Sequence, residues 1–210
     1  MKSKLRNVII CFLLIGAILN IAKLPSLLKE RHIQHDIADN VIRLHILADS
    51  DEDTAQAHKL LVRDAVLSDM APYMETATSK ANALEEIAAH LEQIESTAND
   101  TLISLGDTST VTLSLSNDYF PEKIYGDMTF PKGNYDALRI CIGKAEGHNW
   151  WCVMYPTLCF IDTSTVSVPE SSDELLKDSL EPDSYASLFD SDTKTVFRFK
   201  YLSFLNFLFE

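Results

Sequence analysis

The spacing of apolar residues changes from a helical period to a strand period near Gly106, and that change restricts the fold more than any other feature. Before it, residues 79–98 repeat apolar side chains at three- and four-residue steps, which is the period of an amphipathic helix. After it, residues 111–116 alternate between apolar and polar side chains, which is the period of a half-buried strand. Helices followed by strands indicate an α+β protein.

A further strand is expected ahead of the helices. Residues 41–48, VIRLHILA, are rich in β-branched residues and leucine, as strands are. The acidic segment 49–53 then opens a helix that Pro72 should end. Residues 117–133 hold two prolines and two glycines and are expected to form a loop, and residues 135–143 return to strand. We therefore expect an antiparallel or mixed sheet with two main helices packed on one face, preceded by an N-terminal signal or anchor helix.

The first residues have the composition of an export segment. Lys2, Lys4 and Arg6 precede residues 8–22, which carry no charge. A basic head before an apolar run of this length is typical of a secretory signal, and the run is slightly short for a membrane-spanning helix. Residues 1–23 are therefore expected to be a signal peptide or, if they are not cleaved, a membrane anchor that associates the protein with the membrane.

The rest of the chain is strongly acidic. After the four cations of residues 1–23 it carries 14 basic and 31 acidic side chains, a net charge of −17. Such a surface repels the phosphates of nucleic acids, so a nucleic-acid partner is not expected. The composition divides this part into a polar juxtamembrane stalk (24–40), a core α+β domain (41–163), and an acidic loop with a C-terminal strand and apolar tail (164–210).

The segment 147–160, GHNWWCVMYPTLCF, is the most distinctive part of the chain. Neighbouring residues of a strand point to opposite faces, so Trp150 and Trp151 cannot enter the same side of a sheet. Exposed tryptophans often anchor protein interfaces, and we expect one of the pair to do so. The alternative, in which helices cover one ring and a loop covers the other, is equally compatible with the sequence. The other residues assigned to this partner-binding surface are Arg43, His45, His148, Asn149, Tyr155 and Pro156.

Three cysteines follow the leader, and two of them bracket a proline. The turn at residues 155–156 can bring Cys152 and Cys159 within disulfide range, so we expect a bridge between them. The third cysteine is then free or paired between molecules. The rival hypothesis makes Cys152 a nucleophile with His148 or His45 as its base. Residues four apart on a strand lie about 13 Å from each other, however, which is too far for His148 to act on that sulfur.

Two possible metal sites lack the necessary spacing. Asp49, Asp51 and Asp53 resemble the start of a calcium loop, but such a loop needs glycine after the third acid and glutamate at the twelfth position. Those places hold threonine and leucine, and the three acids are instead assigned to capping the following helix. The histidine and cysteines of residues 147–160 lack CxxC or HExxH spacing. No metal, cofactor or catalytic residue is therefore expected.

Two blocks of the chain resemble the stage II sporulation protein R family of endospore-forming bacteria. They are residues 41–67, VIRLHILADSDEDTAQAHKLLVRDAVL, and residues 135–160, YDALRICIGKAEGHNWWCVMYPTLCF. The HNWWC motif, with a second cysteine seven residues on, is the most specific part of a resemblance that covers most of residues 36–162. The basic leader agrees with it, because members of the family are exported.

This resemblance implies a function. Members are made in the forespore and pass into the space between the two sporulation membranes. There they are needed to activate a membrane-embedded aspartic protease of the mother-cell membrane, which then processes the precursor of sigma-E. We therefore expect a secreted or membrane-anchored signalling protein that binds this receptor protease and is not an enzyme. The competing expectation is an extracytoplasmic cysteine-type hydrolase acting on peptidoglycan or peptide.

Overall fold

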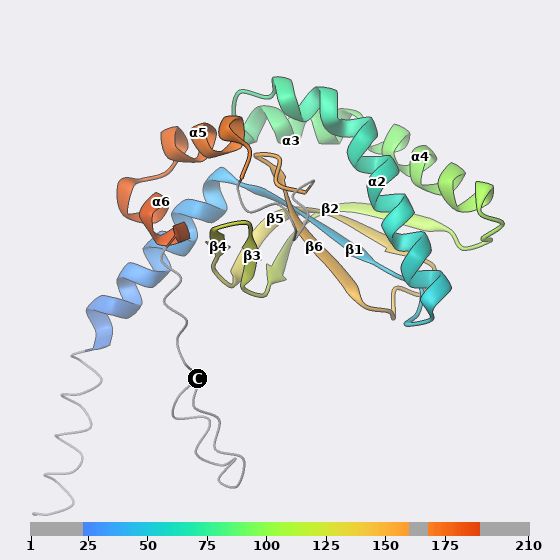
Figure 1. The fold of residues 1–210 in the computed structure, drawn as a ribbon, viewed down its shortest axis with the longest axis horizontal. Helices are drawn as coiled ribbons and strands as arrows, with labels where there is room; N and C mark the ends of the chain where they lie inside the picture. The colour runs from blue at the N-terminus through green and yellow to red at the C-terminus, as the bar shows by residue number, and fades with distance from the viewer. Residues whose placement is uncertain (1–22, 160–167, 190–210) are drawn as a thin grey trace, which may run out of the picture.

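A computed structural model describes residues 23–159 and 168–189 of the chain (Figure 1). Its centre is a four-stranded sheet in the order β2–β5–β1–β6. The strands are β1 (Ile42–Leu47), β2 (Val111–Phe120), β5 (Gly133–Ile142) and β6 (Asn149–Tyr155). β1 runs parallel to β5, whereas the β1–β6 and β2–β5 pairs are antiparallel. The sheet is mixed, and the α+β prediction is confirmed.

Three helices cover one face of the sheet, in one layer along its length (Figure 1). They are α2 (Asp53–Thr76), α3 (Lys80–Ala89) and α4 (Leu91–Ser104). The single helix expected over residues 79–98 is divided at His90, whose backbone (φ −110°, ψ 14°) leaves the helical range and ends one helix as it begins the next. Ile87 before the break and Ile94 after it both reach the core, so the break turns α4 without exposing its apolar side.

The expectation that Pro72 ends the first helix is wrong. α2 continues to Thr76, one turn beyond the proline. Proline inside a helix removes one hydrogen bond and costs about 3 kcal/mol. Met70 and Met74 on either side of it are buried in the core, and this packing offsets the loss.

A second core lies on the opposite face of the sheet. It is covered by a helix over residues 23–40, by the hairpin of β3 (Lys123–Tyr125) and β4 (Met128–Phe130), and by α5 (Glu170–Ser179) and α6 (Pro182–Phe189). The predicted loop 117–133 thus contains the end of β2 and this hairpin, because Phe120, Met128 and Phe130 bury their side chains here. Ile37 of the predicted stalk and Leu176 of the predicted acidic loop are also fully buried in this core.

The predicted signal or anchor lies outside the described residues except for Lys23, and the predicted C-terminal strand and apolar tail lie outside them as well. Within residues 23–159 and 168–189, none of the helices combines the length and the apolar composition that crossing a membrane would need.

Candidate protein-binding surface

The two adjacent tryptophans of β6 lie on opposite faces of the sheet, as strand alternation requires. Trp150 packs against the core under α2–α4. The guanidinium carbon of Arg63 lies 4.3 Å from its ring centroid, and its indole Nε1 is buried. Trp151 packs against the second core instead. Its ring stacks on the imidazole of His45 with centroids 3.7 Å apart, and meets Phe120 edge-on at 4.7 Å.

On the Trp151 face of the sheet, two adjacent rows of side chains are partly exposed among the described residues, although His45 and Leu47 within them are buried. The strand register aligns one row as Ser114, Arg139, His45 and Trp151, and the other as Thr112, Cys141, Leu47 and Asn149. Thr112, Ser114 and Asn149 are exposed, and Trp151 and Cys141 are half-buried. We call these eight residues the open surface. It combines an aromatic pair on β1 and β6 with hydrogen-bonding groups on β5 and β2, and aromatic residues are enriched in protein interfaces.

Hydrogen bonds fix the imidazole at the centre of the open surface. His45 Nδ1 lies 3.1 Å from Asp118 Oδ2, and His45 Nε2 lies 2.8 Å from Asn149 Oδ1. With both ring nitrogens engaged and the side chain only 8% exposed, the ring has little freedom to rotate. The indole of Trp151 therefore rests on a rigid support.

Arg43 does not belong to this surface, because it is fully buried beneath the hairpin. Its guanidinium carbon lies between 4.6 and 5.6 Å from the ring centroids of four aromatic residues, namely Phe120, Tyr125, Phe130 and Tyr135. Arg43 Nε donates to the carbonyl of Cys152 and Nη2 donates to the Tyr125 hydroxyl, which in turn donates to the carbonyl of Trp151. Burial lowers the pKa of this guanidinium and raises the pKa of the Tyr125 hydroxyl. Arg43 thus ties the hairpin to β6.

The structure joins Cys152 and Cys159 by a disulfide, with Cα atoms 5.3 Å apart, and leaves Cys141 free. The turn between the bridged residues faces inward: Tyr155 is 3% exposed, and Pro156 is buried beside it. Neither residue offers a side chain to a partner. A bridged and buried Cys152 is also not a nucleophile, since the attacking species in such chemistry is a free thiolate.

The acids at 49 and 51 hold the β5–β6 loop and do not cap α2. Asp49 Oδ1 accepts a hydrogen bond from the Lys144 amide at 2.8 Å, and Asp51 Oδ1 accepts one from the His148 amide at 2.6 Å. The residue at the N-cap position is Glu52, and its side chain makes no capping bond. The capping expectation is therefore wrong for these two acids, which orient the start of β6. The imidazole of His148 also pairs with Asp51, and its side chain is 77% exposed.

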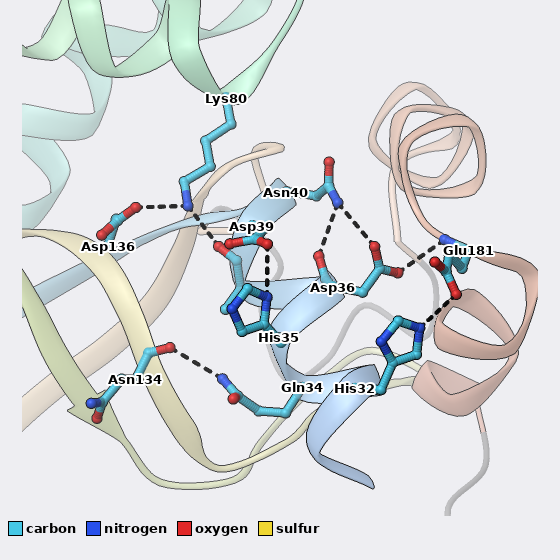
Figure 2. A network of polar contacts seen from close by, with 11 residues as sticks. His32, Gln34, His35, Asp36, Asp39, Asn40, Lys80, Asn134, Asp136 and Glu181 are labelled. Carbon is cyan, nitrogen blue, oxygen red and sulfur yellow. Dashed lines mark hydrogen bonds and ion pairs between the residues drawn. The ribbon is translucent and has the colours of Figure 1, made fainter. Parts of the chain in front are cut away.

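A separate polar network fastens the helix over residues 23–40 to the body of the protein (Figure 2). Lys80 Nζ donates to the carbonyl of Ala38 at 2.6 Å and pairs with Asp136 at 2.7 Å. The hydrogen bond from Lys80 lowers the pKa of the Asp136 carboxyl. On the other side of the helix, His32 pairs with Glu181 at 2.8 Å, which raises the pKa of His32. No group of three or more potential metal ligands occurs among the described residues.

Comparisons with known proteins show the family to which this chain belongs. Residues 38–165 match the model of the family described as stage II sporulation protein R. The stage II sporulation protein R of Bacillus subtilis (strain 168) is 37% identical over 174 residues, which cover 80% of this chain and 78% of that protein. No solved structure matches the chain. The chain therefore belongs to the stage II sporulation protein R family, and its role lies in sporulation.

Proposed function

We propose that this protein is an exported sporulation signal that binds and activates a membrane-embedded aspartic protease of the mother-cell membrane. Activation leads to processing of the sigma-E precursor. The match of residues 38–165 to the family carries this proposal. The basic and apolar segment 1–23 supports export into the space between the two sporulation membranes, as a secreted or anchored protein.

We place the receptor contact on the open surface, with Trp151 as its anchor. A ligand activates a receptor only if it binds the active form better than the inactive form, and a tenfold preference requires about 1.4 kcal/mol. The Trp151 ring is already held against His45 at 3.7 Å, so binding orders few side chains and loses little entropy. His148 is exposed next to Asn149 of the open surface and extends the contact.

Binding is favoured over hydrolysis by the state of the candidate nucleophile. Cys152 is bridged to Cys159 and only 1% exposed. Both ring nitrogens of His45 are engaged by Asp118 and Asn149, so His45 is not poised against a sulfur. The arrangement around these residues supports a rigid binding surface.

Export and signalling are tested together in sporulating cells that lack the gene. Three versions are returned: the full chain, a chain without residues 2–23, and a chain whose residues 1–23 are replaced by an unrelated signal peptide. We expect the first and third to restore cleavage of the sigma-E precursor and the second to fail. Cleavage in the gene-deleted strain contradicts the signalling role, and cleavage supported by the leaderless chain contradicts the need for export.

A further inference from the structure

The β2 edge of the sheet is long and regular, and no other strand among the described residues pairs with it. β2 lies at one end of the strand order and pairs with β5 over ten residues without a register shift. The carbonyl of Thr110 accepts a hydrogen bond from the Gly143 amide, so the even-numbered residues of β2 direct their backbone groups toward β5. The odd-numbered residues Leu113, Leu115, Asn117 and Tyr119 therefore direct their N–H and C=O groups outward.

The opposite edge, β6, is closed by the protein's own groups. The carbonyl of Trp151 accepts from the Tyr125 hydroxyl at 3.0 Å, and the carbonyl of Val153 accepts from the Leu158 amide at 3.0 Å. A register shift between Ile42 and Arg43 also interrupts its pairing with β1. Exposed edges are usually blunted by such devices, or by lysine and proline, because an open edge pairs with other chains. β2, VTLSLSNDYF, has no lysine, no proline and no bulge.

An apolar groove of about 530 Å³ runs beside the open edge. Its walls come from α3, β2 and β5, and include Leu84, Ala88 and Leu115. Leu115 is 37% exposed and Tyr119 is 59% exposed, although α4 covers the start of the same strand. A strand added next to β2 would direct every second side chain to the helix side of the sheet, where this groove lies.

The charged groups around the groove are mainly acidic. Glu85 and Asp136 line it, and Asp39 lines an adjoining cavity of about 230 Å³ that shares Asp136. Lys80 in that cavity is only 14% exposed. Its ammonium pairs with Asp136 and donates a hydrogen bond to the carbonyl of Ala38 (Figure 2). The whole chain has a net charge of −13. The chemistry that complements this groove is therefore a chain with both apolar and basic side chains.

We propose that the outward edge of β2 binds an extended segment of a protein partner, with alternating basic and apolar residues, as a fifth strand of the sheet. Main-chain hydrogen bonds to Leu113, Leu115, Asn117 and Tyr119 supply register, and the groove receives the apolar side chains. This surface is separate from the open surface around Trp151. The strand addition rests on the proposed function only for the identity of the partner. If that function is correct, the partner is the receptor protease.

The strand addition is tested by backbone amide hydrogen exchange on the full chain. The probe is an acetylated and amidated octapeptide in which lysine alternates with valine, and its twin carries glutamate in place of lysine. We expect the lysine peptide to slow exchange at the amides of Leu113, Leu115, Asn117 and Tyr119 at least about tenfold, and the glutamate peptide to leave them unchanged. No slowing at these amides with the lysine peptide overturns the proposal, and so does slowing at Trp151 and Val153 instead.

Two lysine variants show whether peptide binding depends on the groove itself or only on the net charge of the protein. Leu115→Lys should weaken binding of the lysine peptide at least about tenfold, because lysine blunts an edge strand and repels the probe. Ile124→Lys, in the middle of β3, is the matched control and should leave binding unchanged, since Ile124 is 68% exposed and outside the groove. Both variants should melt as cooperatively as the parent. Equal binding by all three chains overturns the proposal.

Other occupants of the edge give different results. If hydrogen exchange at the β2 amides is already slow in the peptide-free chain and becomes fast on dilution, a second copy of the chain occupies the edge. If exchange at these amides becomes fast only when residues 190–210 are removed, that segment of the same chain occupies the edge. Either result overturns a partner strand.

The detergent-solubilised receptor protease then identifies the partner. Slowing at the same four amides assigns the β2 edge to the protease. Binding of the protease without slowing there shows that it uses another surface and overturns that assignment. Absence of binding by the unmodified chain contradicts the proposed function, whereas the peptide result stands independently of it.

Discussion

The indole of Trp151 lies flat on the imidazole of His45, with centroids 3.7 Å apart and planes inclined by 17°. These residues face each other across β6 and β1, and the two ring nitrogens of His45 are held by Asp118 and Asn149. An aromatic ring presented in this way is rigid before any partner arrives. Trp150, by contrast, points to the other core under Arg63. Both rings are half-buried, and they pack against different cores.

Alanine substitution should distinguish the two tryptophans. Trp150→Ala removes a half-buried ring that packs against the core under α2–α4, so it should lower the free energy of unfolding, by less than the about 3–5 kcal/mol typical of a fully buried aromatic ring. Trp151→Ala should leave a cooperatively folded protein that fails to support cleavage of the sigma-E precursor. Urea denaturation and precursor cleavage in sporulating cells measure the two effects. If both variants unfold, or both signal normally, the anchor assignment is wrong.

Removing the disulfide should cost stability and leave signalling intact. The bridge closes a short loop, since its cysteines are seven residues apart, and the loop-entropy model gives about 2.5 kcal/mol for a loop of this size. The Cys152→Ala/Cys159→Ala pair should therefore melt earlier than the parent but still trigger precursor cleavage. Cys141→Ala is the control and should melt with the parent. A folded double variant that no longer signals would favour the cysteine-hydrolase hypothesis.

The buried guanidinium of Arg43 should tolerate an apolar replacement better than a truncation. Arg43→Ala leaves a cavity among four aromatic rings and should lower the free energy of unfolding by about 3–5 kcal/mol. Arg43→Met keeps most of the volume and removes the desolvation of a buried charge, but it leaves the carbonyl of Cys152 without this donor, so it should cost about 1–2 kcal/mol. Chemical denaturation at neutral pH measures both. Equal losses would show that the charge itself, and not packing, is what the hairpin needs.

The Lys80–Asp136 pair should make stability depend on pH in the acid range. The pKa of Asp136 is lowered in the folded protein by the hydrogen bond from Lys80, from a reference value of 3.8. A carboxyl with a lowered pKa stabilises the fold above the unfolded value, and this contribution is lost as the pH falls through the folded value. The urea midpoints of the parent and Asp136→Asn should therefore differ most near neutral pH and converge below pH 3.8. A difference that stays constant down to the acid end contradicts this assignment.

The spacing of apolar residues predicts the helices and strands that bury one face and expose the other. The two-residue alternation of 111–116 predicted β2, and the opposite orientation of Trp150 and Trp151 followed from β6 being a strand. The break at His90 and the passage of α2 through Pro72 depend on tertiary packing, which local propensity does not include. The exposed Leu61 and the buried Lys59 on α2 show the same limit.

Local sequence patterns do not predict the second core, because the residues that form it are far apart in the chain. Ile37, Phe120 and Leu176 meet only after the sheet has formed, and each lies in a segment that is otherwise polar or rich in turn residues. For the same reason Asp118 was missed as the partner of His45, since the two are 73 residues apart. Its place on the same strand as Phe120 is the one local signal. Proximity to the tryptophan pair in the sequence predicts Tyr155 and Pro156 at the partner surface, and the structure buries them instead.

The central claim, that this protein activates a membrane-embedded protease by presenting Trp151, is tested most directly by reconstitution. Vesicles containing the receptor protease and the sigma-E precursor are incubated with the full chain, with Trp151→Ala or with no addition, and precursor cleavage is followed over time. We predict cleavage with the parent chain and almost none with Trp151→Ala or without protein. Equal cleavage in all three samples, or full activity of Trp151→Ala, would contradict the account.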